Sequence, residues 1–320
     1  MVEQSALLSD LAPTAERLFE RHVGTAKEWF PHELVPWSRG RDFEPGEAWD
    51  ESEGEQDAAI RSALYVNLLT EDNLPYYFHS ITGLFGDDDP WGAWARRWTA
   101  EEGRHSIVMR DYFTVTRMID PVDLERGRMH QVCTGYYHGD TLPTASDGFI
   151  YVALQELATR ISHRNTGKML SDKAGYDIMA RVAADENLHY LFYKDIVAAA
   201  LEVDPSGTVI AIERQVRGFE MPGTGILDFQ RHAMAIARAG IYDFDIHHDQ
   251  VLVPVVLRQW GLESVEGLTP EAEEARHRTV RHMRRLRKAA DRFIERRATD
   301  GDRQAGDGQG EAAMKEAQPA

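Results

Sequence analysis

Two short segments of the chain carry residue types that bind metal ions, each a glutamate followed three residues later by a histidine. These pairs are Glu102 with His105 and Glu186 with His189. Residues three apart on a helix lie on the same face, so the carboxylate and imidazole of each pair can bind one ion together. A single pair is weak evidence, because Glu-x-x-His also begins at Glu274, in an arginine-rich segment, where we interpret it as a coincidence.

A lone glutamate precedes each pair at nearly the same distance. Glu71 lies 31 residues before Glu102, and Glu156 lies 30 residues before Glu186. About thirty residues run up one helix, through a turn and down the next helix to the same height. The repeat therefore predicts four helices that direct four carboxylates and two imidazoles toward one another, which is the ligand set of a di-iron or di-manganese four-helix bundle.

Charge and ligand type both favour two divalent ions at this site. Two such ions balance four carboxylates, whose burial without partners would be prohibitive. Oxygen ligands with one imidazole per ion suit iron or manganese better than copper or a structural zinc. Glu102 and Glu186 hold equivalent positions in the repeat, so we predict that they bridge the ions, with Glu71 and Glu156 as terminal ligands.

Composition limits the class of protein and its compartment. The 320 residues are 42% hydrophobic, enough for one large core, and we predict a single domain over 1–298 with a disordered tail over 299–320. A net charge of −17 argues against nucleic-acid binding. No membrane span or signal peptide is expected. Cys133 is the only cysteine, so no internal disulfide can form, which fits a cytoplasmic protein.

Apolar residues recur at helical spacing and alternating strand patterns are nearly absent, so we predict an all-α protein. Pro75, one turn beyond Glu71, should kink the first ligand helix, and Asp89 can cap the second with Pro90 at its first position. The four ligand helices are expected over about 56–83, 90–118, 145–170 and 172–202. Flanking helices are expected over about 6–28, 121–137, 206–219, 224–240, 246–260 and 270–297.

The segments around the four ligand positions also match known motifs. They read LTEDNLPYY at 69–77, WTAEEGRH at 98–105, QELATRISHRNT at 155–166 and AADENLH at 183–189. These segments resemble the soluble acyl-ACP desaturases, the stearoyl-ACP desaturase-like type 2 family of fatty acid desaturases, and in particular its actinobacterial branch. The similarity covers roughly residues 10–297 and includes Trp37 upstream.

The resemblance implies a ferritin-like homodimer with two iron ions in an oxygen-activating centre. Such an enzyme introduces a cis double bond into a saturated fatty acyl chain held on acyl carrier protein, in fatty acid biosynthesis. A ferredoxin-type partner supplies the electrons, and one O2 is reduced to two waters. The chain departs from the family pattern at Gly103, which replaces an Asn, in a shorter insert between the first two ligand helices, and in its tail. These departures bear on regioselectivity and partner choice but remove no ligand.

Three further residues are candidates for roles beside the ligands. Thr159 follows the third ligand by one turn; the matching threonine of the family is linked to proton delivery, and the alternative is a helix threonine bonded to a backbone carbonyl. Asp185 can bond a ligating imidazole. Trp37 can extend that contact to the surface for electron entry, or be an ordinary buried aromatic. His163 and Cys133 are expected to be structural.

Other functions remain open at this point. The radical subunit of ribonucleotide reductase usually offers Asp where this chain has Glu71, and monooxygenase hydroxylases are longer and need companion subunits. A ferritin-like iron-storage or peroxide-scavenging protein is typically half as long and needs no apolar tunnel. A desaturase homologue without activity, serving as an interaction protein, is a further alternative.

The last predicted helix bears on the carrier protein. Ten cations lie between Arg276 and Arg297, opposed there only by Asp291 and Glu295. Acyl carrier proteins are strongly acidic, so in an acidic enzyme they need a local basic surface. The helix either docks the carrier or pairs its arginines with the acidic surface of its own fold.

Overall fold

The structure, a computed structural model, describes residues 4–135 and 142–316, with side chains described as far as Glu295. Within these ranges the chain is helical and contains no strand, which confirms the predicted all-α class. None of the described helices combines the length and the apolar composition needed to cross a membrane.

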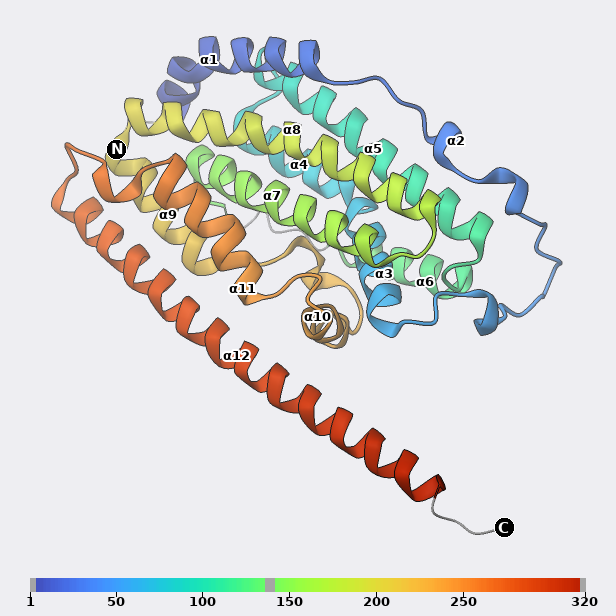
Figure 1. Cartoon of the computed structure of the whole chain (residues 1–320). Helices are drawn as coiled ribbons and strands as arrows, with labels where there is room; N and C mark the ends of the chain where they lie inside the picture. Colours follow the sequence, from blue (N-terminus) through green and yellow to red (C-terminus); the bar gives the residue numbers. More distant parts are fainter. Residues whose placement is uncertain (1–3, 136–141, 317–320) are drawn as a thin grey trace.

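Four helical rods form the central bundle (Figure 1). The first rod is interrupted, and the four consist of α3 (Ala58–Glu71) with α4 (Leu74–Phe85), α5 (Trp91–Thr116), α7 (Ala145–Met169) and α8 (Lys173–Val203). Helix α7 packs along α8, the α3–α4 rod contacts both α5 and α7, and α5 contacts α8. The four rods therefore enclose a common interior between them.

Flanking helices cover the bundle on several sides. Helix α1 (Gln4–Thr25) lies along α8 and α5, and α9 (Pro205–Gly218) packs on α7, with α12 (Pro270–Glu316) outside it (Figure 1). Because α7 has neighbours on both sides, nearly every residue in its first half is buried. The remaining elements are α2 (Pro31–Leu34), α6 (Pro121–Thr134), α10 (Phe229–Arg238), α11 (Phe244–Ile246), the π-helical η5 (His247–Gln259), and the short 3₁₀ turns η1 (Trp37–Arg39), η2 (Glu51–Glu53), η4 (Pro222–Gly225) and η6 (Leu262–Ser264).

The first ligand rod breaks directly after its ligand. Helix α3 ends at Glu71, and α4 begins at Leu74 with Pro75 in its first turn. Proline lacks a backbone N–H and its ring collides with the carbonyl four residues earlier, which here belongs to Glu71. The sequence predicts a kink at Pro75, and the structure shows a full interruption that leaves Glu71 at a helix end.

Side-chain caps begin several of the bundle helices. Asp57 accepts hydrogen bonds from two backbone N–H groups at the start of α3, and Asp172 accepts one at the start of α8. The predicted cap of α5 by Asp89 is wrong. That helix begins at Trp91, so Asp89 lies one residue before the N-cap position, and its carboxylate pairs with Arg96 at 2.9 Å instead.

The last helix is longer than the sequence indicated. Helix α12 begins at Pro270, as expected, and extends to Glu316 and not only to about residue 297. The domain boundary at residue 298 and the disorder of the tail stay predictions. Residues 317–320 of the predicted tail lie outside the described part of the chain, as do residues 136–141 around the loop expected before α7.

Candidate metal centre

Six buried side chains meet inside the bundle, and they are the six predicted ligands. They form two groups of four in which the ligand atoms all lie within 4.8 Å of one another, one made of Glu71, Glu102, His105 and Glu186, and the other of Glu102, Glu156, Glu186 and His189. Glu102 and Glu186 belong to both groups. The geometry therefore offers two adjacent ion positions that share these two carboxylates, and Glu71 and Glu156 each face one position.

Both histidines turn the same nitrogen toward the carboxylates. Nδ1 of His105 lies 3.2 Å from Glu186 Oε1, 3.3 Å from Glu102 Oε2 and 3.6 Å from Glu71 Oε2. Nδ1 of His189 lies 2.7 Å from Glu102 Oε1 and 3.5 Å from Glu156 Oε2. One imidazole thus serves each position, as the repeat in the sequence requires.

The donor atoms at the centre fit metal ions. Five of these buried atoms lie 2.7–3.5 Å from one another but make no hydrogen bond of suitable geometry within the described residues: Glu102 Oε1, His105 Nδ1, Glu156 Oε2, Glu186 Oε1 and His189 Nδ1. Buried polar atoms are almost always satisfied, so a cluster of unsatisfied oxygens and imidazole nitrogens facing one another calls for a partner. A pair of cations would coordinate these atoms and neutralise the carboxylates.

The electrostatics of the carboxylates support the same conclusion. Burial raises the pKa of Glu156 well above its ordinary value, and the charges of Glu186 and Glu102 raise it further. Burial and the charge of Glu186 also raise the pKa of Glu102. Contacts with His105 instead lower the pKa values of Glu71 and Glu186. The ionised forms of Glu102 and Glu156 are thus the unfavourable ones in this dry site, and divalent cations would stabilise them.

A second pair of carboxylates faces the outer nitrogens of the histidines. Asp185 Oδ2 lies 3.5 Å from His105 Nε2, too far for a good hydrogen bond, and it accepts a hydrogen bond of 2.7 Å from Trp29 Nε1. Burial tends to raise the pKa of Asp185, but the neighbouring His105, Trp29 and Arg181 lower that pKa to about 2. The equivalent carboxylate on α5 is Glu101, whose Oε2 lies 3.0 Å from His189 Nε2.

Sequence reasoning missed Glu101, although the repeat contains the signal for it. Glu101 precedes Glu102 as Asp185 precedes Glu186, so the two carboxylates occupy the same position in the two halves. In both halves the carboxylate reaches across to the histidine of the opposite helix, and not to that of its own.

Trp37 does not extend the contact from Asp185. It is 50% exposed, and its Nε1 donates to the backbone carbonyl of His32 at 2.8 Å. Trp29 takes the place that the sequence assigned to Trp37, stacking 6.5 Å from the ring of His105. The physical reason is the path of the chain, because Trp29 comes just after α1 along the bundle, whereas Trp37 follows α2 on the surface.

The remaining candidate residues lie at different distances from the centre. Oγ1 of Thr159 lies 2.6 Å from Glu186 Oε2 and 3.1 Å from the carbonyl of Glu156, so it is placed both to reach the centre and to bond its own helix. His163, expected to be structural, has its Nε2 3.1 Å from Glu71 Oε1. Cys133 is exposed. Glu274 is exposed as well and pairs with Arg278, so it is not one of the residues at the centre.

Trp98 is a further contact that sequence reasoning missed. Its Nε1 donates a hydrogen bond of 2.9 Å to Oε1 of Glu156. Trp98 lies one helical turn before Glu102 on α5, so its spacing places it on the inner face and was the available signal. Each of the two glutamates predicted as terminal ligands therefore contacts a ring nitrogen, Glu71 that of His163 and Glu156 that of Trp98.

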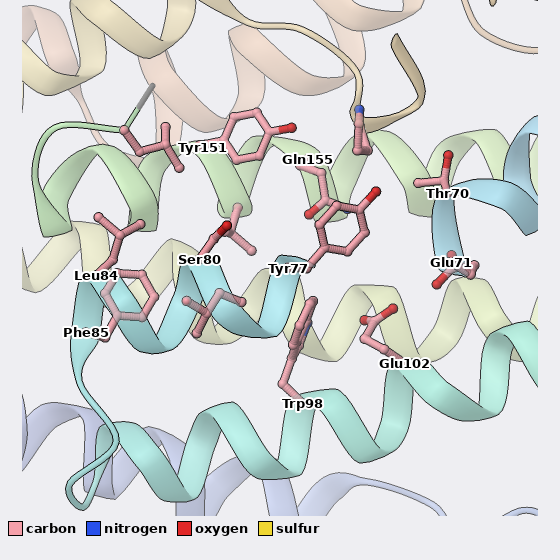
Figure 2. A pocket seen from close by; sticks show the side chains of 14 residues that line it. Thr70, Glu71, Tyr77, Ser80, Leu84, Phe85, Trp98, Glu102, Tyr151 and Gln155 are labelled. Carbon is pink, nitrogen blue, oxygen red and sulfur yellow. The ribbon is translucent and has the colours of Figure 1, made fainter. Parts of the chain in front are cut away.

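An elongated hollow leads to the carboxylates. It is narrow, with a cavity volume of about 50 Å³, and Figure 2 shows Leu84 and Phe85 at one end and Glu71 and Glu102 at the other. Tyr77 lies between these ends. A second hollow, with a cavity volume of about 80 Å³, lies between α3, α7 and α10 and shares Glu71 and Thr70 with the first. Apolar space therefore approaches the centre from two sides.

The chain is similar to known proteins over most of its length. A family model described as fatty acid desaturase matches residues 3–306. DesA1 of Mycobacterium tuberculosis (strain H37Rv), whose name gives acyl-[acyl-carrier-protein] desaturase as a provisional assignment, is 39% identical over 307 residues, which cover 93% of this chain and 90% of that protein. The stearoyl-[acyl-carrier-protein] 9-desaturase 6 of Arabidopsis thaliana is 33% identical over 248 residues, 72% of this chain and 62% of that protein.

A solved structure agrees with this relationship. The crystal structure of DesA2 from Mycobacterium tuberculosis H37Rv, also assigned provisionally as an acyl-ACP desaturase, superimposes with a TM-score of 0.66 at 27% identity and covers 84% of this chain and 99% of its own. The helical bundle, the six converging ligand residues and these matches lead to one conclusion: the chain belongs to the fatty acid desaturase family.

Proposed function

We propose that the protein is an acyl-ACP desaturase that introduces a cis double bond into a saturated fatty acyl chain carried by acyl carrier protein, in fatty acid biosynthesis. One observation supports the proposal: an apolar hollow ends at two carboxylates of a cluster of six residues that could hold metal ions. The names of the relatives support the carrier-bound substrate.

The chemistry demands a cofactor, because no protein side chain is strong enough to break an unactivated C–H bond. Two iron ions held by Glu71, Glu102, His105, Glu156, Glu186 and His189 would supply the oxidising power, drawn from O2. The overall reaction removes two hydrogens from the acyl chain and, with two electrons and two protons, reduces one O2 to two waters. A ferredoxin-type protein is the proposed electron donor.

The residues of the chain position the substrate and keep water away. The hollow presents Leu84, Phe85 and Ile81 to an acyl chain, whose burial stabilises the complex by about 0.8 kcal/mol for each CH₂. Tyr77 and Trp98 line the hollow between its apolar end and the carboxylates. An acyl chain lying in the hollow would bring its carbons past Glu71 and Glu102.

The carrier protein is proposed to dock on α12. Arg276, Arg278 and Arg287 are engaged by acidic groups of the same chain. Within the described residues, no ion pair is found for five exposed cations, which we call the basic stripe: Arg281, Arg284, Arg285, Lys288 and Arg292. Their spacing places them on one face of the helix. Three arginines of α12 therefore pair with the acidic surface of their own fold. The basic stripe is the part of the helix proposed to contact an acidic carrier.

We also propose that the protein acts in the cytoplasm as a homodimer. The test is incubation of the iron-loaded protein with stearoyl- or palmitoyl-ACP, ferredoxin, its reductase and O2. Formation of a mono-unsaturated acyl chain supports the proposal, and mass spectrometry of the released acid locates the double bond. If the protein binds two irons per chain but oxidises neither substrate, the proposed substrate is wrong. A protein that binds no iron when purified aerobically or after reconstitution contradicts the metal centre itself.

A further inference from the structure

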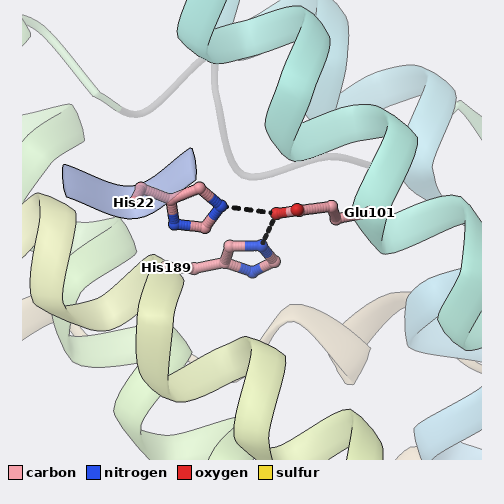
Figure 3. A group of neighbouring side chains, drawn as sticks. All are labelled: His22, Glu101 and His189. Atoms are coloured by element: carbon pink, nitrogen blue, oxygen red, sulfur yellow. Dashed lines mark hydrogen bonds and ion pairs between the residues drawn. The ribbon is translucent and has the colours of Figure 1, made fainter. Parts of the chain in front are cut away.

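A buried histidine of the N-terminal helix reaches the metal centre. His22, in the last turn of α1, is 4% exposed, and its Nε2 lies 2.8 Å from Oε2 of Glu101. The same oxygen lies 3.0 Å from Nε2 of His189 (Figure 3). One carboxylate oxygen therefore joins a histidine outside the bundle to a proposed metal ligand inside it.

The other oxygen of Glu101 is held by arginine. Nε of Arg97 donates to Oε1 at 2.7 Å, and the guanidinium of Arg104 lies 3.7 Å away. With Oε1 engaged, Oε2 is the atom presented to the two imidazoles. These groups are close enough to consider a third ion between them. Arg97 already neutralises Glu101, however, and His189 directs its Nδ1 to the two-ion centre, so a hydrogen-bonded arrangement is the better account.

We propose that His22 is a positioning residue for His189. An N–H of His22 holds Glu101, and Glu101 accepts the Nε2–H of His189, which leaves the lone pair of His189 Nδ1 directed at the metal position. The inference rests on the metal centre of the proposed function. Its content is that α1, which supplies no ligand, sets the affinity of one ion of the pair.

The other half of the bundle has a matching arrangement built from different residues. There Trp29 holds Asp185, which faces Nε2 of His105. The indole N–H is a donor with no acceptor role. In each half, therefore, a ring from the N-terminal segment bonds a bundle carboxylate, and that carboxylate faces one proposed ligand, at 3.0 Å in the half with His189 and at 3.5 Å in the half with His105. Trp29 acts on the ion beside His105 and His22 acts on the ion beside His189, so each serves as the control for the other.

The test is a Co²⁺ titration of the metal-free, full-length protein, followed by its visible absorption. In His22→Leu, one of two ions should bind roughly 10- to 100-fold more weakly while the other keeps its affinity. His22→Gln should bind nearly as the wild type does, because the amide of glutamine can donate from about the position of Nε2. Trp29→Phe should weaken one ion, and combining it with His22→Leu should weaken both. Far-UV circular dichroism checks that each variant is folded.

Several outcomes would overturn the inference. His22→Leu with two ions bound at wild-type affinity would make His22 irrelevant to the metal. His22→Gln as weak as His22→Leu would show that ring packing matters and the hydrogen bond does not. Equal weakening of both ions in His22→Leu would show a general loss of stability. If the wild-type protein binds no Co²⁺ or iron, the metal centre of the proposed function fails, which is a different result from a failure confined to His22.

Discussion

Thr159 donates a hydrogen bond from its Oγ1 to Oε2 of Glu186 across 2.6 Å, the shortest contact of this hydroxyl group. The acceptor is one of the two carboxylates shared by both ion positions. The hydroxyl group can thus pass a proton toward the centre. It also lies 3.1 Å from two backbone carbonyl oxygens of its own helix, to which it can donate a hydrogen bond instead.

We expect Thr159→Val to keep the fold and the iron content but to lower the yield of product per O2 consumed, with hydrogen peroxide accumulating. The valine has nearly the same shape but offers no proton. Proton transfer by a placed group commonly contributes about 10²-fold or more to a rate, so the effect should be easily measured by an oxygen electrode and product analysis. Thr159→Ser, which retains the hydroxyl group, is the matched control. Normal coupling in the valine variant would reduce Thr159 to a helix-stabilising residue.

The ligand residues should differ in what their loss does. Because Glu186 belongs to both groups of four, Glu186→Ala should weaken both ions, whereas Glu156→Ala should weaken mainly the ion beside His189. Iron per chain, measured by mass spectrometry after reconstitution, distinguishes the two results. Glu274→Ala, in the third Glu-x-x-His, should leave the iron content at the wild-type value. A loss of iron in that control would contradict the assignment of the centre.

Removing the metal should destabilise the protein. The metal-free state buries carboxylates whose mutual repulsion the ions would relieve, as the raised pKa of Glu156 indicates. A ligand at 100 times its Kd stabilises the folded state by about 2.7 kcal/mol, so chelation should lower Tm and re-addition of Fe²⁺ should restore it. The same treatment of Glu186→Ala should change Tm much less. A wild-type Tm that does not respond to chelation would argue that no ion occupies the bundle.

Leu84 tests the position of the acyl chain. It lines the apolar end of the hollow away from the carboxylates, so Leu84→Trp should shorten the space for the end of the chain and shift the preference toward shorter acyl groups. Competition between acyl-ACP substrates of different length measures this shift. Val122→Trp, at a 50% exposed position on α6, is the control for adding a tryptophan. If Leu84→Trp raises KM equally for all lengths, Leu84 lies at the entrance and not at the end.

The basic stripe tests the docking of the carrier. Reversing Arg284, Arg285 and Lys288 to Glu should raise KM for acyl-ACP several-fold and leave the iron content unchanged. The wild-type KM should also rise with salt, because screening weakens attraction between exposed charges.

The control for the basic stripe applies the same change of charge elsewhere. Arg126, Lys173 and Arg231 are exposed cations on α6, α8 and α10, and reversing them should leave KM near the wild-type value. If KM changes neither with salt nor with the charge reversal on α12, the docking surface lies on another part of the protein. Equal effects of both triple variants would mean that total charge matters and the basic stripe does not.

The convergence of the six proposed ligands could be predicted from the sequence, because its signals are local. A glutamate and a histidine three residues apart share a helical face whatever the rest of the fold does, and the even spacing from Glu71 and Glu156 requires only two helical hairpins. The interruption after Glu71 was also readable, as a kink, from Pro75. The cap of α5 was not, because a shift of one residue at a helix start removes Asp89 from the N-cap position.

The surroundings of the six proposed ligands could not be predicted from local signals. Glu101 and Asp185 each face the histidine of the opposite helix, which depends on how α5 and α8 are oriented toward each other. Trp29 replaces Trp37 beside Asp185 across 156 residues of sequence, and His22 meets Glu101 across 79. Such contacts carry no periodicity of their own. They depend on the path of the N-terminal segment over the bundle. That path is set by the packing of the whole apolar face of the segment, so no short sequence motif predicts these contacts.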